Sequence, residues 1–131
     1  MTAFTHCNLR RDVEDTAPSF NIAPDVEARF SRDVLECEKG AVGYFRLAPN
    51  KRFPFAHRQK LQEETYVVIG GGGRMKIGDE IIDLAPLDAV RVVPEVGRAL
   101  ESGPDGLEYV VFGAPHTGPG DGEMVEGFWT E

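Results

Sequence analysis

The chain has 131 residues, of which 41% are hydrophobic and 27% charged, a composition that suits one globular domain with a modest apolar core. Its formal net charge of −8 at pH 7 argues against a nucleic-acid partner, because phosphate binding requires a surface rich in lysine and arginine. No apolar run approaches the roughly 20 residues of a membrane span, and residues 1–20 lack the apolar core of a secretory signal. We therefore predict a cytoplasmic protein without a membrane or nucleic-acid partner, in which Cys7 and Cys37 are free thiols.

The predicted elements begin after a polar segment, residues 1–25, which we expect to form an N-terminal arm packed on the domain. From residue 26 onward, short apolar runs alternate with turn-forming residues and predict strands over 26–30, 33–37, 41–47, 53–59, 63–69, 74–77, 80–84, 88–93, 97–101 and 107–113. The pair Gly78-Asp79 predicts a tight hairpin, and turns are also expected at residues 70–73 and 103–106. Short strands at such spacing are typical of a β-sandwich or barrel. The tail, residues 114–131, is rich in Gly and Pro and is expected to lie over the barrel, with Phe128 and Trp129 as anchors in this chain or in a partner.

The segment from Phe53 to Gly70 carries the most chemical information. Side chains alternate between the two faces of a strand, so His57, Gln59 and Glu63, all at odd-numbered positions, are expected on the same face. Two side chains at i and i+2 on one strand, joined by a carboxylate from the next strand, can converge inside a barrel. Three protein ligands arranged in this way leave an open metal position for a substrate.

This segment resembles the first motif of the cupin superfamily, which reads His-x-His, three or four residues, Glu, six residues, Gly. The chain has His57-x-Gln59, three residues, Glu63, six residues and Gly70. The second cupin motif ends in a fourth ligand, a histidine, and Arg98 stands at that position. The resemblance covers about residues 40–114. It implies an all-β fold, a double-stranded β-helix or jelly-roll barrel, in a single domain that spans residues 1–131.

Two of the four inherited ligand positions are altered, and the residues leave three interpretations open. Gln59 offers only a neutral amide oxygen, and Arg98 keeps a permanent positive charge. A divalent transition metal could still be held by His57, Gln59 and Glu63. Alternatively, Arg98 pairs with Glu63 in a purely structural polar network. In the third interpretation, Arg98 has donors available for a carboxylate or phosphate, which its planar guanidinium suits.

The sequence favours a protein that binds a small, anionic metabolite in a pocket of His57, Gln59, Glu63 and Arg98, without a standard metal centre. One alternative is a cupin enzyme, an isomerase, epimerase, lyase or dioxygenase, with or without a metal; whether the protein is an enzyme stays open. Another is a structural role, in which a dimer surface matters and the pocket is vestigial. Runs that are apolar on both faces, such as residues 110–112, predict a homodimer.

Overall fold

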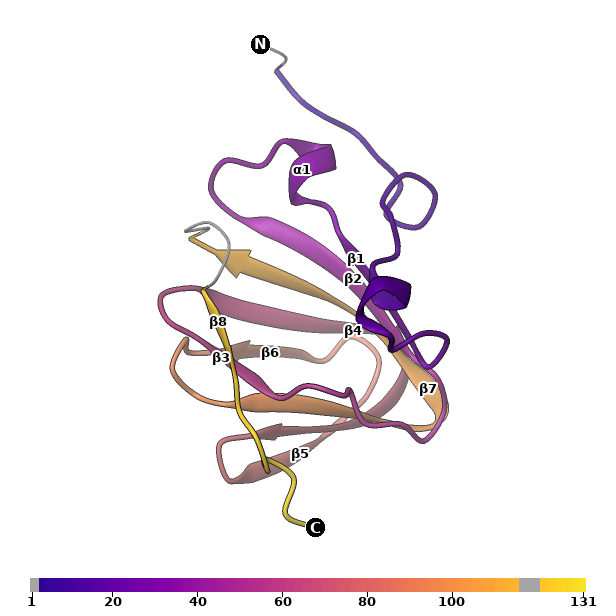
Figure 1. The fold of residues 1–131 in the computed structure, drawn as a ribbon, viewed down its shortest axis with the longest axis vertical. Helices are drawn as coiled ribbons and strands as arrows, with labels where there is room; N and C mark the ends of the chain where they lie inside the picture. Colours follow the sequence, from indigo (N-terminus) through magenta and orange to yellow (C-terminus); the bar gives the residue numbers. More distant parts are fainter. Residues whose placement is uncertain (1–2, 116–120) are drawn as a thin grey trace.

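The computed structural model describes residues 3–115 and 121–131, which form mainly antiparallel strands (Figure 1). The strands are β1 (Val26–Phe30), β2 (Ala41–Leu47), β3 (His57–Gln59), β4 (Glu63–Ile77), β5 (Glu80–Leu84), β6 (Ala89–Val92), β7 (Arg98–Ala114) and β8 (Gly122–Met124). A 3-10 helix, η1 (Ala17–Phe20), precedes β1, and a single helical turn, α1 (Arg32–Leu35), follows it. None of the helices in these ranges is long and apolar enough to cross a membrane.

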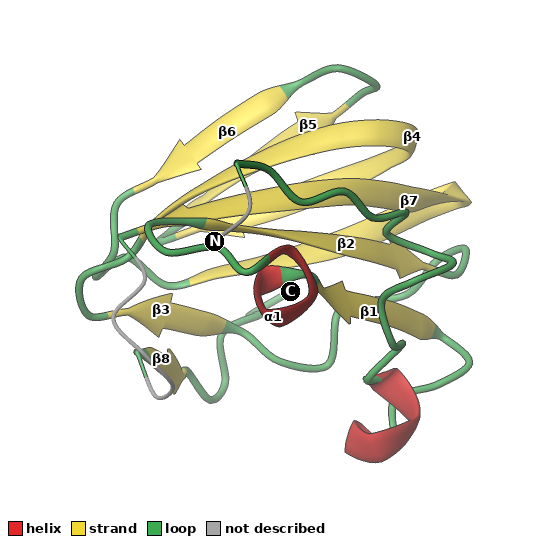
Figure 2. Ribbon diagram, turned by 90° about the horizontal axis from the view of Figure 1, so that it is seen from above, coloured by secondary structure: helices red, strands yellow, loops and turns green. Residues whose placement is uncertain are grey.

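Two long strands, β4 and β7, bend and connect two sheets. The first sheet has the order β1, β2, the second half of β7, the first half of β4, and β6. The second has the order β5, the second half of β4, the first half of β7, β3 and β8. Figure 2 shows these strands curled around a common interior. The prediction of an all-β jelly-roll barrel is therefore confirmed.

The two glycine-rich segments are bends within strands, so the turns predicted at residues 70–73 and 103–106 are wrong. Both segments lie inside continuous strands, and the ladder between β4 and β7 shifts register on either side of Gly71. Gly71 has a positive φ of 67°. A Cβ atom on Gly73 would lie only 1.9 Å from the carbonyl oxygen of Glu101. Glycine is required here because the two backbones approach closely where both strands bend.

Two further strand predictions were wrong for local reasons. A strand was predicted over residues 33–37, but residues 33–35 belong to the helical turn α1, which ends at Leu35 and is followed by Glu36 with a φ of 57°. Val34 in this turn is 45% exposed, so no burial favours an extended strand there. Residues 53–59 were also predicted as a strand, yet β3 begins only at His57. Pro54 has no N–H to donate to a ladder, which accounts for the late start.

The apolar core fills the space between the two sheets. The buried ring of Phe45 stacks on Tyr109 with the ring centres 5.3 Å apart, and Tyr66 lies 6.2 Å from Tyr109. Met75 and Leu47 are almost completely buried in the same cluster. These side chains come from both sheets, so the core holds the sheets together and leaves the remaining interior to polar residues.

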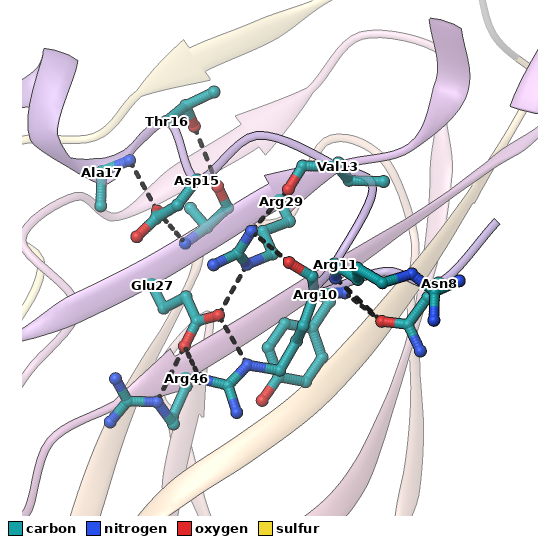
Figure 3. Close-up of polar contacts among 12 residues, drawn as sticks. Asn8, Arg10, Arg11, Val13, Asp15, Thr16, Ala17, Glu27, Arg29 and Arg46 are labelled. Carbon is teal, nitrogen blue, oxygen red and sulfur yellow. Dashed lines mark hydrogen bonds and ion pairs between the residues drawn. The ribbon is translucent and has the colours of Figure 1, made fainter. Parts of the chain in front are cut away.

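The segment before β1 packs on the outer face of the first sheet and covers a buried carboxylate (Figure 3). Glu27 is only 3% exposed and receives hydrogen bonds from Arg10, Arg29 and Arg46. Burial alone would raise the pKa of Glu27, but the three guanidinium groups lower it from 4.5 to about 2. Arg29 also donates to the backbone carbonyls of Arg10 and Val13, which ties the segment to the sheet.

The C-terminal segment, residues 121–131, crosses the second sheet after forming β8 (Figure 1). Its aromatic residues face cations on that sheet and beside it. The guanidinium of Arg52 lies 4.3 Å from the centre of the Trp129 ring, and the ammonium of Lys76 lies 4.6 Å from that of Phe128. Both residues expected to anchor the tail therefore contact the sheet, while residues 116–120 of the tail lie outside the described ranges.

Candidate functional site

Five polar side chains meet inside the barrel around the carboxylate of Glu64, and we call them the Glu64 cluster. His57 and Gln59 come from β3, Glu64 and Tyr66 from β4, and Arg98 from the start of β7. Nε2 of His57 lies 3.1 Å from Oε1 of Glu64, and Nε2 of Gln59 donates to Oε2 over 3.3 Å. The hydroxyl of Tyr66 donates to Oε1 over 2.6 Å. Nη1 of Arg98 forms an ion pair with the same oxygen at 3.7 Å.

The structure places three of the four predicted site residues together and corrects the fourth. Glu63, predicted to face the pocket, is exposed and forms an ion pair with Arg91 at 3.4 Å on the outside of the barrel. Its neighbour Glu64 points inward and occupies the predicted place of the carboxylate. The predictions made for Glu63, including that of a metal ligand beside His57 and Gln59, therefore apply to Glu64.

Glu64 and not Glu63 points inward because of the loop between β3 and β4. In an unbroken strand Glu63 would lie on the same face as Gln59, but residues 60–62 leave the strand conformation and face Asp121. The amides of Leu61 and Gln62 donate to the carboxylate of Asp121, which interrupts the parity. The cupin motif also permits four residues before its glutamate. That spacing selects Glu64 and places the motif glycine at residue 71, where φ is positive, so a signal for the correct residue was present in the sequence.

Electrostatics keep Glu64 ionised and Tyr66 neutral. Burial favours the neutral form of Glu64, but hydrogen bonds from His57 and Tyr66 and the charge of Arg98 outweigh it, so the pKa of Glu64 is lowered. Burial and the nearby charge of Glu64 raise the pKa of Tyr66 well above its ordinary value of 10. Tyr66 is therefore a fixed hydrogen-bond donor to a carboxylate that carries a full charge.

Arg98 is the residue in this cluster whose bonding capacity is least used. Its side chain is 0% exposed. Nη2 donates to the carbonyl oxygen of Val93 over 2.7 Å, but Nε and Nη1 are buried without a hydrogen-bond partner among the described residues. A guanidinium stays charged in proteins, and buried donors normally have partners. Arg98 thus brings a positive charge into the barrel interior, together with two nitrogens that have no hydrogen-bond partner in the described part of the chain, although Nη1 forms the ion pair with Glu64.

The donor set is a poor match for a tight transition-metal centre. Only His57 and Glu64 supply good metal ligands, and no group of three His, Cys, Asp or Glu residues suited to a metal occurs in the described part of the chain. Gln59 directs its amide nitrogen at Glu64. The guanidinium of Arg98 lies within 3.7 Å of the carboxylate that a cation would need, so a metal would meet a fixed positive charge. These residues therefore do not suit a standard metal centre.

Exposure decreases from His57 inward. The side chain of His57 is 32% exposed, that of Glu64 12% and that of Arg98 0%. Two hollows on the described surface, of about 210 and 610 Å³, lie at the bends of β4 and β7, and no residue of the Glu64 cluster lines them. A molecule that reaches the cluster from solvent therefore meets His57 first. This imidazole is hydrogen-bonded to the carboxylate of Glu64.

The sequence matches no family model and no curated protein. Among solved structures, the chain is similar to a cupin protein from Bacteroides fragilis, with a TM-score of 0.71, 20% identity, and coverage of 92% of this chain and 91% of that one. It is also similar to an oxalate decarboxylase variant from Bacillus subtilis, with a TM-score of 0.75, 17% identity, and coverage of 95% of this chain but 34% of that one. A third neighbour is a sugar phosphate isomerase of the cupin superfamily from Silicibacter pomeroyi, with a TM-score of 0.62, 16% identity, and coverage of 70% and 60%. At identities of 20% or less these similarities concern the fold.

Proposed function

Because the chain has the cupin fold, we propose that it binds a small anionic metabolite inside the barrel, at Arg98, without a standard metal centre. The observation that carries this proposal is the unsatisfied guanidinium of Arg98, which is completely buried and has two nitrogens without a hydrogen-bond partner among the described residues. A planar guanidinium is well suited to bind a carboxylate or a phosphate through parallel hydrogen bonds.

The surrounding charges favour a singly charged ligand. Glu64 carries a negative charge 3.7 Å from Nη1 of Arg98, so the two residues together are close to neutral. A phosphate dianion would meet repulsion from Glu64, whereas a carboxylate meets less. We therefore propose a small carboxylic acid as the ligand, with His57 and Gln59 contacting its other polar groups near the entrance.

A thermal-shift screen followed by calorimetry tests this proposal. The panel contains small monocarboxylates, hydroxy acids, dicarboxylates, neutral sugars and sugar phosphates. We expect at least one carboxylate to stabilise the protein, by about 2.7 kcal/mol at a concentration one hundred times its Kd. The Arg98→Met variant should lose this stabilisation, whereas Arg91→Met, which removes an exposed arginine outside the barrel, should keep it.

Either of two results would contradict the proposal. The first is a panel in which no carboxylate raises the Tm of the wild-type protein. The second is a carboxylate that stabilises the Arg98→Met variant as much as the wild type, since binding would then not involve this guanidinium. Far-ultraviolet circular dichroism of the variant establishes that it is folded before the comparison is made.

A homodimer is proposed through the outer face of the first sheet. Val67 and Val110 pair across β4 and β7 on this face, beside Phe112, which is 50% exposed, and Ile69, which is 44% exposed. Exposed apolar clusters of this kind mark interaction surfaces. The exposed pair of Glu63 with Arg91 provides charges of both signs at its rim, which allows a second copy related by a two-fold axis to place opposite charges together.

Molecular mass in solution tests the dimer. Size-exclusion chromatography with light scattering should give twice the chain mass at micromolar concentration. The Phe112→Glu variant should give the monomer, because a charge on this face opposes burial. Phe20→Glu, which alters a 58% exposed ring on η1 instead, should remain dimeric. A wild-type protein that is entirely monomeric would refute the proposal.

A further inference from the structure

The strand that carries His57 and Gln59 receives most of its support from the C-terminal segment. β3 pairs with β7 at a single position, His57 opposite Arg98. On its other side all three residues of β3 pair with β8, with His57 opposite Met124 and Gln59 opposite Gly122. Backbone hydrogen bonds extend this contact, from Val125 N to the carbonyl of residue 56 and from residue 60 N to the carbonyl of residue 121.

A strand of three residues at the edge of a sheet provides little stability by itself, so β8 needs an anchor. The residues after it supply one. Phe128 packs against Gly97, where a Cβ atom would lie 3.0 Å from the ring, and its carbonyl oxygen accepts a hydrogen bond from the ammonium of Lys76. Lys76 is itself only 7% exposed, so this contact is desolvated.

Trp129 and Glu131 form the second half of the anchor. The guanidinium groups of Arg52 and Arg74 lie 4.3 and 5.8 Å from the centre of the Trp129 ring. Arg74 forms an ion pair with Glu131 at 2.6 Å, and Arg52 donates to the backbone oxygen of the same residue over 3.1 Å. Glu101 orients both arginines through hydrogen bonds of 2.7 and 2.8 Å.

We propose that residues 125–131 act as a strap that holds β8, and through β8 holds His57 and Gln59 against Glu64. Trp129 is then a positioning residue for the site. Glu64 and Arg98, the buried half of the cluster, do not depend on the strap. They lie on β4 and β7, which pair with each other along most of their length. Release of the strap would loosen the half of the cluster that faces solvent and leave the buried half in place. The strap thus sets how firmly His57 and Gln59 are held against Glu64.

The attachment of the strap is expected to depend on ionic strength. Its contacts include the ion pair of Arg74 with Glu131, whose side chains are 32% and 51% exposed. At 1 M salt the Debye length is about 3 Å, so the attraction within exposed ion pairs is weakened. The ring of Trp129 also contacts these cations, and such contacts strengthen when they are shielded from water.

Hydrogen exchange measured by NMR on the full chain, without ligand, tests the strap. In Trp129→Ala we expect the backbone amides of residues 57–62 to exchange about tenfold faster, while those of residues 107–112 keep their wild-type rates. The His57 ring resonances should shift at the same time. Trp129→Phe, which keeps an aromatic ring over Arg52, should restore much of the protection, and Phe20→Ala should change neither region.

Two outcomes would overturn the inference. Unchanged exchange at residues 57–62 in Trp129→Ala would mean that the strap does not hold β3. A uniform acceleration that includes residues 107–112 would mean that Trp129 supports the whole fold and not β3 in particular. Because no ligand enters this experiment, failure of the carboxylate screen leaves its result unaffected.

Discussion

Replacing Glu27 with glutamine is expected to lower the free energy of unfolding by about 3 kcal/mol at pH 7. Glu27 is 3% exposed and receives hydrogen bonds from three guanidinium groups. Its pKa of about 2, lowered from 4.5, corresponds to roughly 3 kcal/mol of preference for the charged form in the folded protein. The variant retains the three arginines and removes the negative charge to which all three donate.

The lowered pKa of Glu27 also predicts that the stability of the protein depends on pH. Because the folded-state pKa lies below the unfolded value, the contribution of Glu27 is fully present above pH 4.5 and is lost as the pH falls toward 2. The wild-type protein should therefore lose about 3 kcal/mol more than Glu27→Gln across this window. Urea denaturation at a series of pH values measures both curves.

The control is Glu14→Gln, which removes an exposed carboxylate from the same N-terminal segment. We expect its Tm to stay close to that of the wild type, whereas Glu27→Gln should melt about 10 °C lower. A Glu27→Gln variant as stable as Glu14→Gln at pH 7 would show that solvent screens the arginines, of which Arg10 is 60% and Arg46 42% exposed.

The double substitution Gln59→His with Arg98→His is expected to convert the Glu64 cluster into a metal site. It places imidazoles at two positions beside His57 and Glu64 and removes the fixed positive charge. Imidazole and carboxylate donors suit zinc and nickel. We expect the Kd for zinc to fall about a thousandfold, from about 1 mM in the wild type to about 1 µM, as measured by calorimetry on protein without a histidine tag.

Two matched comparisons make this experiment specific. Gln59→His alone should bind zinc weakly, because Arg98 remains beside Glu64. In the double variant, a further Glu64→Gln change should abolish binding, whereas Glu63→Gln should not, since Glu63 faces solvent and Arg91. Equal losses from the two glutamate changes would contradict the assignment of Glu64 as the inward carboxylate. A double variant without zinc affinity would mean that the backbone no longer has the geometry of a metal site.

Most of the fold could be predicted from local patterns. The strands predicted at 26–30, 41–47 and 80–84 have the observed ends, and the Gly78-Asp79 turn joins β4 to β5. The cupin-like motif positions include His57, Gln59 and Arg98, all of which lie in the Glu64 cluster. These features depend on residue type and short spacing, which a single sequence displays.

The bends could not be predicted from the same patterns. A run of glycines such as residues 70–73 has the composition of a turn, and the sequence predicted a turn. Whether such a run ends a strand or bends it depends on the partner strand. Here the partner strand is so close that a Cβ atom on Gly73 would lie 1.9 Å from the carbonyl oxygen of Glu101. That partner, Glu101 on β7, is distant in sequence, so its approach is a property of the folded chain.

The sequence by itself determined the all-β class, several strands, and three members of the polar cluster, because these follow from alternation, turn residues and motif spacing within short segments. The cupin motif permits either Glu63 or Glu64, and the tertiary structure decided in favour of Glu64, since the contacts of residues 61 and 62 with Asp121 interrupt the strand alternation between Gln59 and β4. It also decided that the C-terminal tail supports the strand of His57. Both results depend on contacts between residues about sixty positions apart, which local patterns do not contain.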